Sequence, residues 1–352
     1  MLPRQNTKKS NKLIACDLFS GSGAVTAALK QSGFNVVIAV DNDRAACETY
    51  RLNHRDVSLY QRDIRKLPVN KLSLPSHLDL LVVCAPCQPF SSQNRKRGED
   101  HRAQLVLESV KFIKRLSPKL VFFENVPGLA SSPVYCKLKQ LLAKNGYILS
   151  KARTFNAADF GVPQRRNRCV LMASKSKKAL ECFNNFTPSN IKKTVFDAIG
   201  ALPPLRAGEG DASDKLHKAR DHQPIVLERL RHIPMNGGSR SSLPPKLQLA
   251  CHKSTDNNSF PDVYGRMRWN DVAPTLTTGC TDVTKGRFAH PEQDRAITLR
   301  EAAILQGFPK DYKFAGNSST VATQIGNAVP LGLVEGLAPL MKKMIAMATT
   351  KR

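Results

Sequence analysis

The sequence predicts an α/β fold: a doubly wound, mostly parallel sheet with helices on both faces, and a smaller irregular domain. Three features predict it. Short apolar runs alternate with helical stretches in the first half of the chain, and a glycine turn joins the first strand to the first helix. Loops rich in Pro, Gly, Asn and Ser replace this pattern after about residue 186. Strands that alternate with helices form parallel sheets, because the connecting helices lie on the faces of the sheet.

The elements follow one another in the order that such a sheet requires. LIACDLF is an apolar run typical of a buried strand, and Ser20–Gly23 turns the chain into a helix that Gly33 ends. NVVIAV is the second strand, with Asp41 at its end and Asp43 as a candidate cap for the next helix. Further strands are expected at LDLLVVC and KLVFFEN, helices at about 103–116 and 133–144, and edge strands at YILSKARTF and RNRCVLMAS.

The chain is expected to divide into a basic tail (1–11), an α/β domain (12–185), an irregular domain (186–297) and a segment returning to the α/β domain (298–352). In the last segment, regular structure resumes with TLREAAILQGFP. A final helix is expected after a polar turn, QIGNAVP. With 352 residues and 41% hydrophobic composition, the chain can bury one large core and a smaller one.

The charge of the chain favours a polyanionic partner. It has 54 Lys and Arg against 28 Asp and Glu, a net charge of +26, for which nucleic acid is the usual explanation. A generally basic protein is the alternative. Residues 186–297 contain 16 basic and 12 acidic residues, so that segment carries only +4 of the total.

Cysteine usage indicates the compartment. The nine cysteines are an odd number without regular spacing, and the chain shows no signal peptide. A reduced cytoplasmic compartment is therefore expected. No apolar run approaches the length of a membrane span.

The turn DLFSGSG has the features of a nucleoside-binding site. Gly21 and Gly23 allow a ligand to approach the backbone at a helix N-terminus, and Asp41 is placed to bind ribose hydroxyls. A dinucleotide fingerprint would need a third glycine where this chain has Thr26. That difference argues against a nicotinamide or flavin cofactor, and an ordinary tight turn remains the alternative.

Cys87 is the candidate nucleophile, because it follows a buried strand where open α/β sheets place their ligands. Two alternatives involve the pair Cys84 and Cys87, whose Cys-x-x-Cys spacing also suits a redox pair or half of a zinc site. No second pair completes a zinc site, so no metal is expected. Pro89 favours a loop rather than the helix that a redox pair usually opens.

Two further motifs supply charge near the same edge of the sheet. Glu124 ends the strand beside the Cys87 strand and could share a proton with a heterocycle; a helix cap is the alternative. In QRRNR, Arg166 and Arg168 alternate and would share one face of a strand, which suits phosphate or carbonyl oxygens. A solvated basic edge strand is the alternative.

Together these motifs resemble the DNA (cytosine-5)-methyltransferase family. DLFSGSG, Asp41, Asp63-Ile64, PCQPFS, ENVPG, QRRNR and GNAVP appear in the family's order, and the match covers nearly the whole chain outside 186–297. Ala24 departs from the glycine that many relatives have. The resemblance implies a Rossmann-like fold and transfer of a methyl group from S-adenosyl-L-methionine to carbon 5 of a flipped-out cytosine in double-stranded DNA. It identifies the irregular domain as a target-recognition domain.

The resemblance also implies a role for each matching residue. The catalytic residues would be Cys87, the nucleophile, Glu124, which contacts the base, and Arg166 and Arg168, which position the base and the active-site loop. The cofactor would be held by Phe19, Gly21, Gly23, Asp41, Asp63, Ile64, Asn327 and Val329. The substrate would be bound by Pro86, Gln88, Ser91, Asn125, Val126 and Thr277, the last by a weaker similarity.

The resemblance implies a bacterial DNA methyltransferase, which is expected to be monomeric and associated with the nucleoid. It would be either solitary or accompanied by a separate restriction endonuclease. Methylation of transfer RNA is disfavoured, because that branch usually carries Cys-Phe-Thr after ENV and has a small middle segment. A catalytically inactive DNA-binding relative is disfavoured by the intact Cys87, Glu124, Arg166 and Arg168. Thr26 argues against an oxidoreductase. The DNA sequence that is recognised does not follow from the chain.

Overall fold

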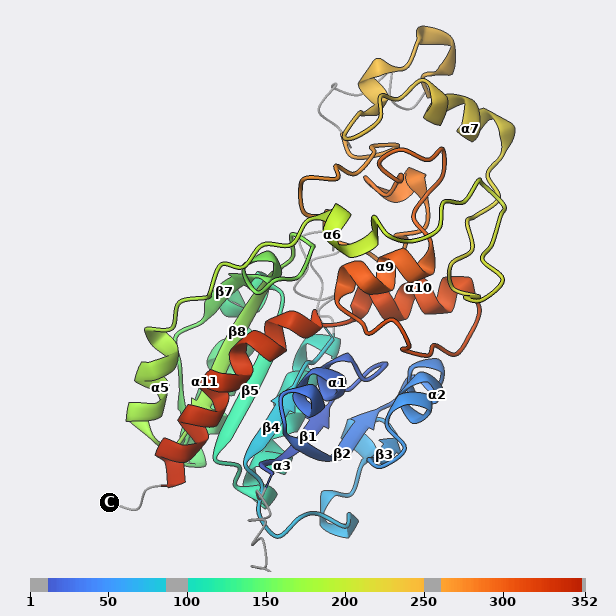
Figure 1. Cartoon of the computed structure of the whole chain (residues 1–352). Coiled ribbons are helices and arrows are strands. Elements are labelled where there is room, and N and C mark those ends of the chain that lie inside the picture. Colours follow the sequence, from blue (N-terminus) through green and yellow to red (C-terminus); the bar gives the residue numbers. More distant parts are fainter. Residues whose placement is uncertain (1–11, 87–100, 250–260, 350–352) are drawn as a thin grey trace, which may run out of the picture.

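The fold is built around one mostly parallel sheet, as the sequence predicts, but the sheet has eight strands and includes β3, which the sequence analysis did not predict. The computed structural model describes residues 12–86, 101–249 and 261–349 (Figure 1). The strand order is β3-β2-β1-β4-β5-β8-β6, and β7 also pairs with β8. The strands are β1 (Ile14–Leu18), β2 (Asn35–Asp41), β3 (Ser58–Gln61), β4 (Leu80–Val83), β5 (Leu120–Asn125), β6 (Ile148–Leu149), β7 (Arg153–Asn156) and β8 (Asn167–Ser174).

The first five strands are parallel, and they determine where a ligand can bind. β1 pairs with β2 on one side and with β4 on the other, so the chain reverses its direction of winding between β1 and β4. β4 and β5 are buried along their whole length, which explains their unbroken apolar sequences. In open sheets of this kind, ligands bind beyond the carboxyl ends of the strands at such a reversal.

Helices cover both faces of the sheet (Figure 1). On one face, α1 and α5 pack against α11, and their apolar residues share a core with β1 and β2. On the other face, α3 and α4 contribute to a second core. The helices are α1 (Ala24–Gln31), α2 (Arg44–Asn53), α3 (Ser109–Leu116), α4 (Pro133–Lys144), α5 (Lys177–Asn184) and α11 (Leu331–Thr349). Asp43 caps α2 as expected, accepting a hydrogen bond from the backbone of Ala46 at 2.7 Å.

The later strands differ from the expected pair of edge strands. β8 lies inside the sheet, because its residues pair antiparallel with β5 on one side and with β6 and β7 on the other. Pairing on both sides explains why all but the first residue of β8 are buried. The short segments β6 and β7 form the edge of the sheet on this side, and β3 forms the opposite edge.

The segment after residue 186 has little regular structure, which agrees with its Pro- and Gly-rich sequence. It contains α6 (Val195–Ile199) and α7 (Pro224–Arg231), and α7 lies at the end of the molecule that is farthest from the sheet (Figure 1). Part of this segment has a small core of its own, around Leu230, Tyr264 and Val283. Residues 267–288 also pack into the core of the first sheet face.

The C-terminal segment brings two helices to the opening of the sheet before α11 returns to it. These are α9 (Leu299–Gln306) and α10 (Ser318–Asn327). Gln324–Asn327 forms the last turn of α10, so the polar turn expected before the final helix is shorter than predicted and begins at Ala328. The capping side chain of Asn317 starts α10 by accepting a hydrogen bond from Thr320 at 2.9 Å.

Short 3₁₀ helices complete the fold. The helix expected at about 103–116 is a 3₁₀ segment followed by α3, and Ser109 marks the boundary by donating a hydrogen bond to the carbonyl of Val106 at 2.6 Å. Among the described residues, no helix is long and apolar enough to cross a membrane. The 3₁₀ helices are Ile64–Lys66, Val69–Lys71, His101–Glu108, Pro127–Ser131, Ala157–Asp159, Arg240–Ser242, Pro245–Leu247 and Val283–Lys285.

Candidate active site

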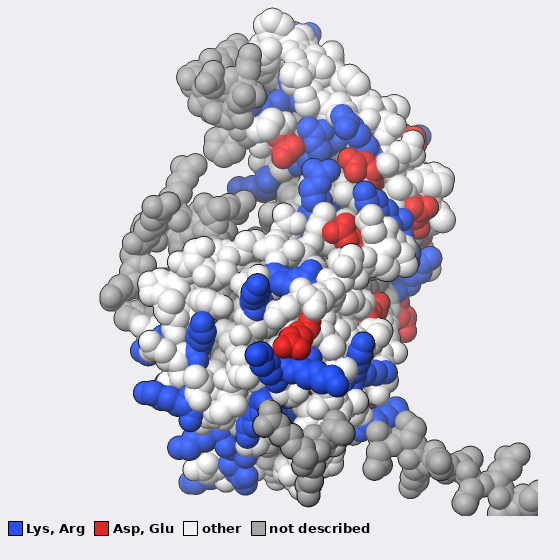
Figure 2. All heavy atoms as spheres, turned by 90° about the vertical axis from the view of Figure 1, so that its left-hand side faces the viewer, with Lys and Arg blue, Asp and Glu red and all other residues white. Residues whose placement is uncertain are grey.

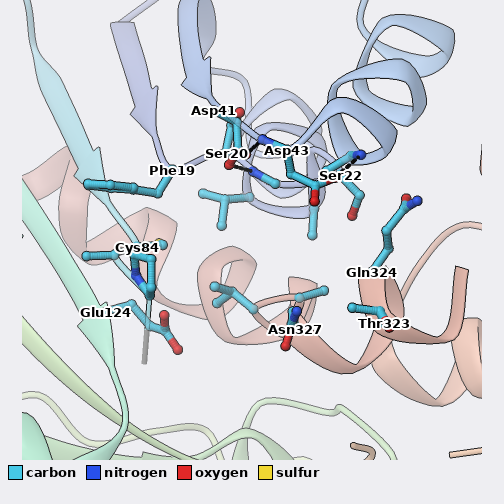
Figure 3. Close-up of a pocket in the computed structure, with 18 of the residues that line it drawn as sticks. Phe19, Ser20, Ser22, Asp41, Asp43, Cys84, Glu124, Thr323, Gln324 and Asn327 are labelled. Atoms are coloured by element: carbon cyan, nitrogen blue, oxygen red, sulfur yellow. Dashed lines mark hydrogen bonds between the residues drawn. The ribbon is translucent and has the colours of Figure 1, made fainter. Parts of the chain in front are cut away.

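A cavity of about 440 Å³ opens at the carboxyl ends of β1, β2, β4 and β5. Its walls come from distant parts of the sequence: the turn after β1, the end of β2, the loop after β4, and α10 (Figure 3). This volume is within the range of small-molecule sites in proteins. Five of the eight predicted cofactor residues line it: Phe19, Gly21, Asp41, Asn327 and Val329.

The glycine turn forms one wall and places its backbone against the cavity. Gly21 has a φ of +52° and no neighbouring atom within 4 Å of the position a Cβ would take, so the space beside it is free for a ligand. Phe19 also has a positive φ, +61°, which is unusual for a residue with a side chain and indicates local strain. The turn thus combines an open glycine with a strained aromatic residue at the cavity wall.

Asp41 holds this turn against the end of β2. Its carboxylate accepts hydrogen bonds from the backbone N–H groups of Gly21 at 2.8 Å and Asp43 at 2.9 Å. Burial raises the pKa of Asp41, while these backbone hydrogen bonds oppose the shift. These bonds give the carboxylate a fixed position at the cavity wall (Figure 3).

Helix α10 forms the opposite wall, where Thr323, Gln324 and Asn327 face the cavity (Figure 3). Among the described residues that line the cavity, Ser20 and Gln324 each have a buried side-chain oxygen without a hydrogen-bond partner, Oγ and Oε1 respectively. Buried polar atoms normally have a partner. A polar ligand between the two walls would supply one.

Two residues that the sequence analysis missed join these walls. The Tyr312 hydroxyl donates a hydrogen bond to the carbonyl of Ser22 at 2.6 Å, and His54 Nε2 lies 3.1 Å from the carbonyl of Gly23 and 3.2 Å from Tyr312 Oη. A Cβ on Gly23 would lie within 2.8 Å of both side chains, so this position needs a glycine. No motif connects residue 54 with residue 312; only the fold brings them together.

Glu124 and Arg168 form a buried ion pair at the other end of the cavity. Their side chains are 2.9 Å apart, and the exposed fractions of the two residues are 6% and 9%. Burial raises the pKa of Glu124, and the nearby guanidinium groups of Arg168 and Arg166 oppose that shift. A raised pKa favours the exchange of a proton between a carboxyl and its ligand.

Arg166 has a different position from Arg168. Its guanidinium donates hydrogen bonds to the carbonyls of Leu276 at 2.7 Å, Gly326 at 2.6 Å and Ala328 at 3.2 Å. Arg166 directly precedes β8, so these bonds join the start of β8 to the segment near Thr277 and to the end of α10. Both arginines are buried, which excludes the solvated edge strand that the sequence left open.

The remaining predicted substrate residues lie around the loop after β4. Pro86 lines the cavity, and Asn125 donates a hydrogen bond from its side chain to the carbonyl of Ala85 at 3.0 Å. Asn125 thus anchors the start of the loop that carries Cys87. Cys87, Gln88 and Ser91 themselves lie outside the described residues.

Several predicted residues are near the cavity but do not line it. Gly23 starts α1, Asp63 caps the 3₁₀ helix Ile64–Lys66, and the Ile64 side chain is buried in the second core. Val126 follows β5, and the Thr277 backbone packs against Gly326.

Cys84, the partner in the Cys-x-x-Cys pair, borders the cavity. Burial and the charge of Glu124 raise the pKa of its thiol well above the usual value, so the thiol form predominates at neutral pH. Among the described residues, no group of three or more His, Cys, Asp and Glu side chains could hold a metal ion.

The sequence was compared with known families and proteins. The family model described as C-5 cytosine-specific DNA methylase matches residues 14–343. The type II methylase M.HgiDII of Herpetosiphon aurantiacus is 38% identical over 341 residues, which cover 94% of this chain and 95% of that protein. The type II methyltransferase M1.HphI of Haemophilus parahaemolyticus is 33% identical, with 93% and 86% covered.

Solved structures show the same fold. A DNA modification methyltransferase encoded within an E. coli prophage has a TM-score of 0.72 and 24% sequence identity, covering 95% of this chain and all of that one. The S. pombe Dnmt2 methyltransferase has a TM-score of 0.64 at 18% identity, with 94% and 99% covered. At these identities the likeness concerns the fold alone.

Proposed function

Because this chain belongs to the C-5 cytosine-specific DNA methylase family, we propose that its cavity binds S-adenosyl-L-methionine and that the Glu124 end receives a flipped-out cytosine. The protein is a sequence-specific DNA (cytosine-5)-methyltransferase; the family transfers the methyl group through a covalent adduct between a cysteine and the base. The observation that supports this proposal is the buried Glu124–Arg168 pair, which lines the same cavity as Pro86. Asn125, the residue after Glu124, bonds to the carbonyl of Ala85, two residues before Cys87.

The cavity suits this cofactor in shape and charge. Among the described lining residues, Glu124 is paired with Arg168, so that Asp41 and Asp43 supply the carboxyl groups without a paired guanidinium. Such a lining favours a cation, and the cofactor is a sulfonium that supplies an electrophilic methyl group. Gly21 leaves space at the backbone, and Ser20 and Gln324 each have a buried side-chain oxygen without a hydrogen-bond partner in the described structure. Phe19, Asp41, Asn327 and Val329 would hold it, with no metal.

The proposed chemistry activates a base that is a poor nucleophile at carbon 5. The Cys87 thiolate adds to carbon 6, while Glu124 gives a proton to ring nitrogen 3, so that electron density moves to carbon 5. Carbon 5 would take the methyl group of S-adenosyl-L-methionine, which leaves S-adenosyl-L-homocysteine. A base would then remove the proton at carbon 5 as the bond to Cys87 breaks, and Glu124 would take back the proton of ring nitrogen 3, which restores the neutral ring. The base must leave the stack for these steps, at a cost of a few kcal/mol.

The two arginines would have different roles. Arg168 fixes Glu124 through the 2.9 Å ion pair and is the nearer guanidinium to the cavity, where it would face the carbonyl oxygen of the cytosine. Arg166 is bonded to three carbonyls and would act by holding the segment at Thr277 and the end of α10 in place around the base.

The domain assignment is also part of the proposal. Residues 12–185 would form the catalytic domain with the C-terminal segment 298–352, and residues 186–297 the target-recognition domain, with 1–11 as a basic tail. The small separate core around Leu230 and Tyr264 supports an independent unit that reads base edges. We propose that the enzyme is a monomer on DNA, in the bacterial nucleoid, where a restriction endonuclease could act separately on the same site.

Bisulfite sequencing tests the function directly. DNA is sequenced from a host without cytosine-5 methylation that expresses the wild-type chain, Cys87→Ala or the control Cys136→Ala, which changes an exposed cysteine on α4. The wild type and the control should methylate one short motif, whereas Cys87→Ala should methylate nothing, because carbon 6 receives no nucleophile.

Methylation that persists with Cys87→Ala would exclude Cys87 as the nucleophile. A soluble wild-type protein that binds the cofactor and leaves this DNA unmethylated would contradict the proposed substrate.

A further inference from the structure

Most of the positive charge of this enzyme is outside the segment that would read DNA bases. Residues 131–193 contain 13 Lys and Arg but only two acidic residues, Asp159 and Glu181, a net of +11 out of +26. Residues 186–297 carry only +4. A charge excess of this size needs an explanation other than base readout.

The fold gathers part of this charge into one surface, which we call the lysine corner: Lys144, Lys151, Lys175, Lys177 and Lys178. All five residues are exposed. They come from two segments that β6 joins to the end of β8: Ile148 and Leu149, shortly after α4, pair with Ser174 and Ala173, shortly before α5. The Lys175 Nζ atom lies 5.2 Å from the centre of the Tyr147 ring, three residues after Lys144. Figure 2 shows Lys and Arg gathered on the lower half of this face, with few acidic side chains among them.

The charges of the lysine corner are not neutralised by neighbours. Within the described ranges 12–86, 101–249 and 261–349, none of the five lysines forms an ion pair. Their neighbour Lys119, by contrast, pairs with Asp79 at 2.8 Å and so does not belong to the corner. Holding unpaired like charges together costs free energy, which a bound polyanion would recover.

The corner is at the opposite end of the sheet from the active site. It adjoins Ser174, which hydrogen-bonds to the carbonyl of Lys119 just before β5 begins, whereas Glu124 is near the end of β5. Six strand residues span roughly 20 Å. A duplex lying across the cavity would have to bend sharply to reach the corner, and such bending costs on the order of 1–6 kcal/mol.

We propose that the lysine corner binds the phosphate backbone of a second segment of duplex DNA, beyond the segment that enters the active site. Lysine ammonium groups suit this task, because they act as point charges toward phosphates and carry no sequence information. The contact would hold the enzyme on long DNA between methylation events. It depends on the DNA substrate of the family and not on the assignment of any catalytic residue.

The test compares two triple variants of the full chain. Lys175→Gln/Lys177→Gln/Lys178→Gln removes three charges from the corner; Arg55→Gln/Lys66→Gln/Lys71→Gln removes three exposed charges from the segments flanking β3, at the other sheet edge. Dissociation constants are measured over a range of salt concentrations, with a plasmid-length duplex and with a duplex too short to reach the corner. Transfer RNA and vesicles of anionic lipid serve as further probes, and methylation is assayed separately.

On long DNA, the plot of log K against log salt concentration should be less steep for the corner variant, by about two to three in the magnitude of its slope. Each phosphate contact contributes about 0.9 to that slope, and the variant removes three charges. Its affinity for the short duplex and its methylation rate should stay within twofold of wild type, and the control variant should keep the wild-type slope. An unchanged slope in the corner variant, or an equal loss in both variants, would overturn the proposal. So would a loss confined to transfer RNA or to vesicles, which would assign the corner to another polyanion.

Discussion

At the scale of single residues, side chains inside and outside the motifs hold the site together by donating hydrogen bonds to backbone carbonyls. Tyr312 bonds to the carbonyl of Ser22, Asn125 to that of Ala85, and Arg166 to those of Leu276, Gly326 and Ala328. Each bond fixes a loop whose neighbouring residues face the ligand. Removing one hydroxyl should therefore affect binding without unfolding the protein.

Tyr312→Phe should weaken binding of S-adenosyl-L-methionine. The hydroxyl that holds the glycine turn is lost, and one such hydrogen bond contributes about 0.5–1.5 kcal/mol, or roughly 2- to 12-fold in the dissociation constant. Isothermal titration calorimetry without DNA measures this constant directly.

Tyr147→Phe is the matched control. It removes a buried hydroxyl that donates to the carbonyl of Pro118, also at 2.6 Å, at the far end of the sheet. Both variants should lose similar stability in urea, but only Tyr312→Phe should lose cofactor affinity. Equal affinities in the two variants would mean that Tyr312 has only a structural role.

At the scale of elements, the position of α10 decides whether the cavity has a second wall. Gly326 lies against the backbone near Thr277: a Cβ there would be 2.5 Å from the carbonyl carbon of Thr277 and 2.6 Å from the nitrogen of Thr278. The glycine of the GNAVP motif thus permits a close approach between a helix and a backbone segment. Neither partner can give way easily, because Arg166 bonds to both.

Gly326→Ala should push α10 away from the segment at Thr277. Overpacking of this kind costs about 1–3 kcal/mol of the free energy of unfolding, measured by urea denaturation. Because Gln324 and Asn327 move with the helix, cofactor affinity should fall as well. Ser318→Ala, an exposed change on the same helix, should leave both quantities unchanged. A Gly326→Ala variant with wild-type stability and affinity would show that the contact relaxes without cost.

At the scale of the whole molecule, a buried polar network joins the irregular segment to the C-terminal helices. Arg295 forms two hydrogen bonds to Glu301 at 2.7 and 2.8 Å, and Glu301 caps α9 together with Thr298. His290 is 2% exposed and 3.9 Å from Glu301. Burial lowers the pKa of His290 to about 4 from its usual 6.5, against the opposing charge of Glu301.

This pKa predicts a loss of stability in acid. Between about pH 6.5 and pH 4 the unfolded chain binds a proton at His290 that the folded chain does not, so stability falls as the pH falls through this window. His54, with a pKa of about 4, contributes in the same direction, whereas Asp17, whose pKa burial raises to about 7, contributes in the opposite direction.

A variant isolates the contribution of His290. From pH 7.5 to pH 5.5, the free energy of unfolding of wild type should fall by about 1 kcal/mol more than that of His290→Gln, measured by urea denaturation. His232→Gln, which changes an exposed histidine directly after α7, should follow the wild type. Parallel pH profiles of the wild type and His290→Gln would contradict the buried neutral state of His290.

The sequence by itself determined the class of fold and the edge of the sheet at which the cavity opens. The apolar runs predict β1, β2, β4 and β5, because strands that are buried on both faces of a sheet have nearly continuous apolar sequences. Their carboxyl ends then locate Asp41 and Glu124 at one edge of the sheet, and the motif order identifies the family. These are local patterns, so a single chain is enough to read them.

Only the tertiary structure decided which residues meet. It placed β8 inside the sheet, made α10 the second wall, and brought His54 and Tyr312 to the glycine turn. It also separated Arg168, which faces Glu124, from Arg166, which joins three backbone segments. These contacts join residues up to 290 positions apart, and no local spacing encodes them, because they follow from how the helices pack on the sheet.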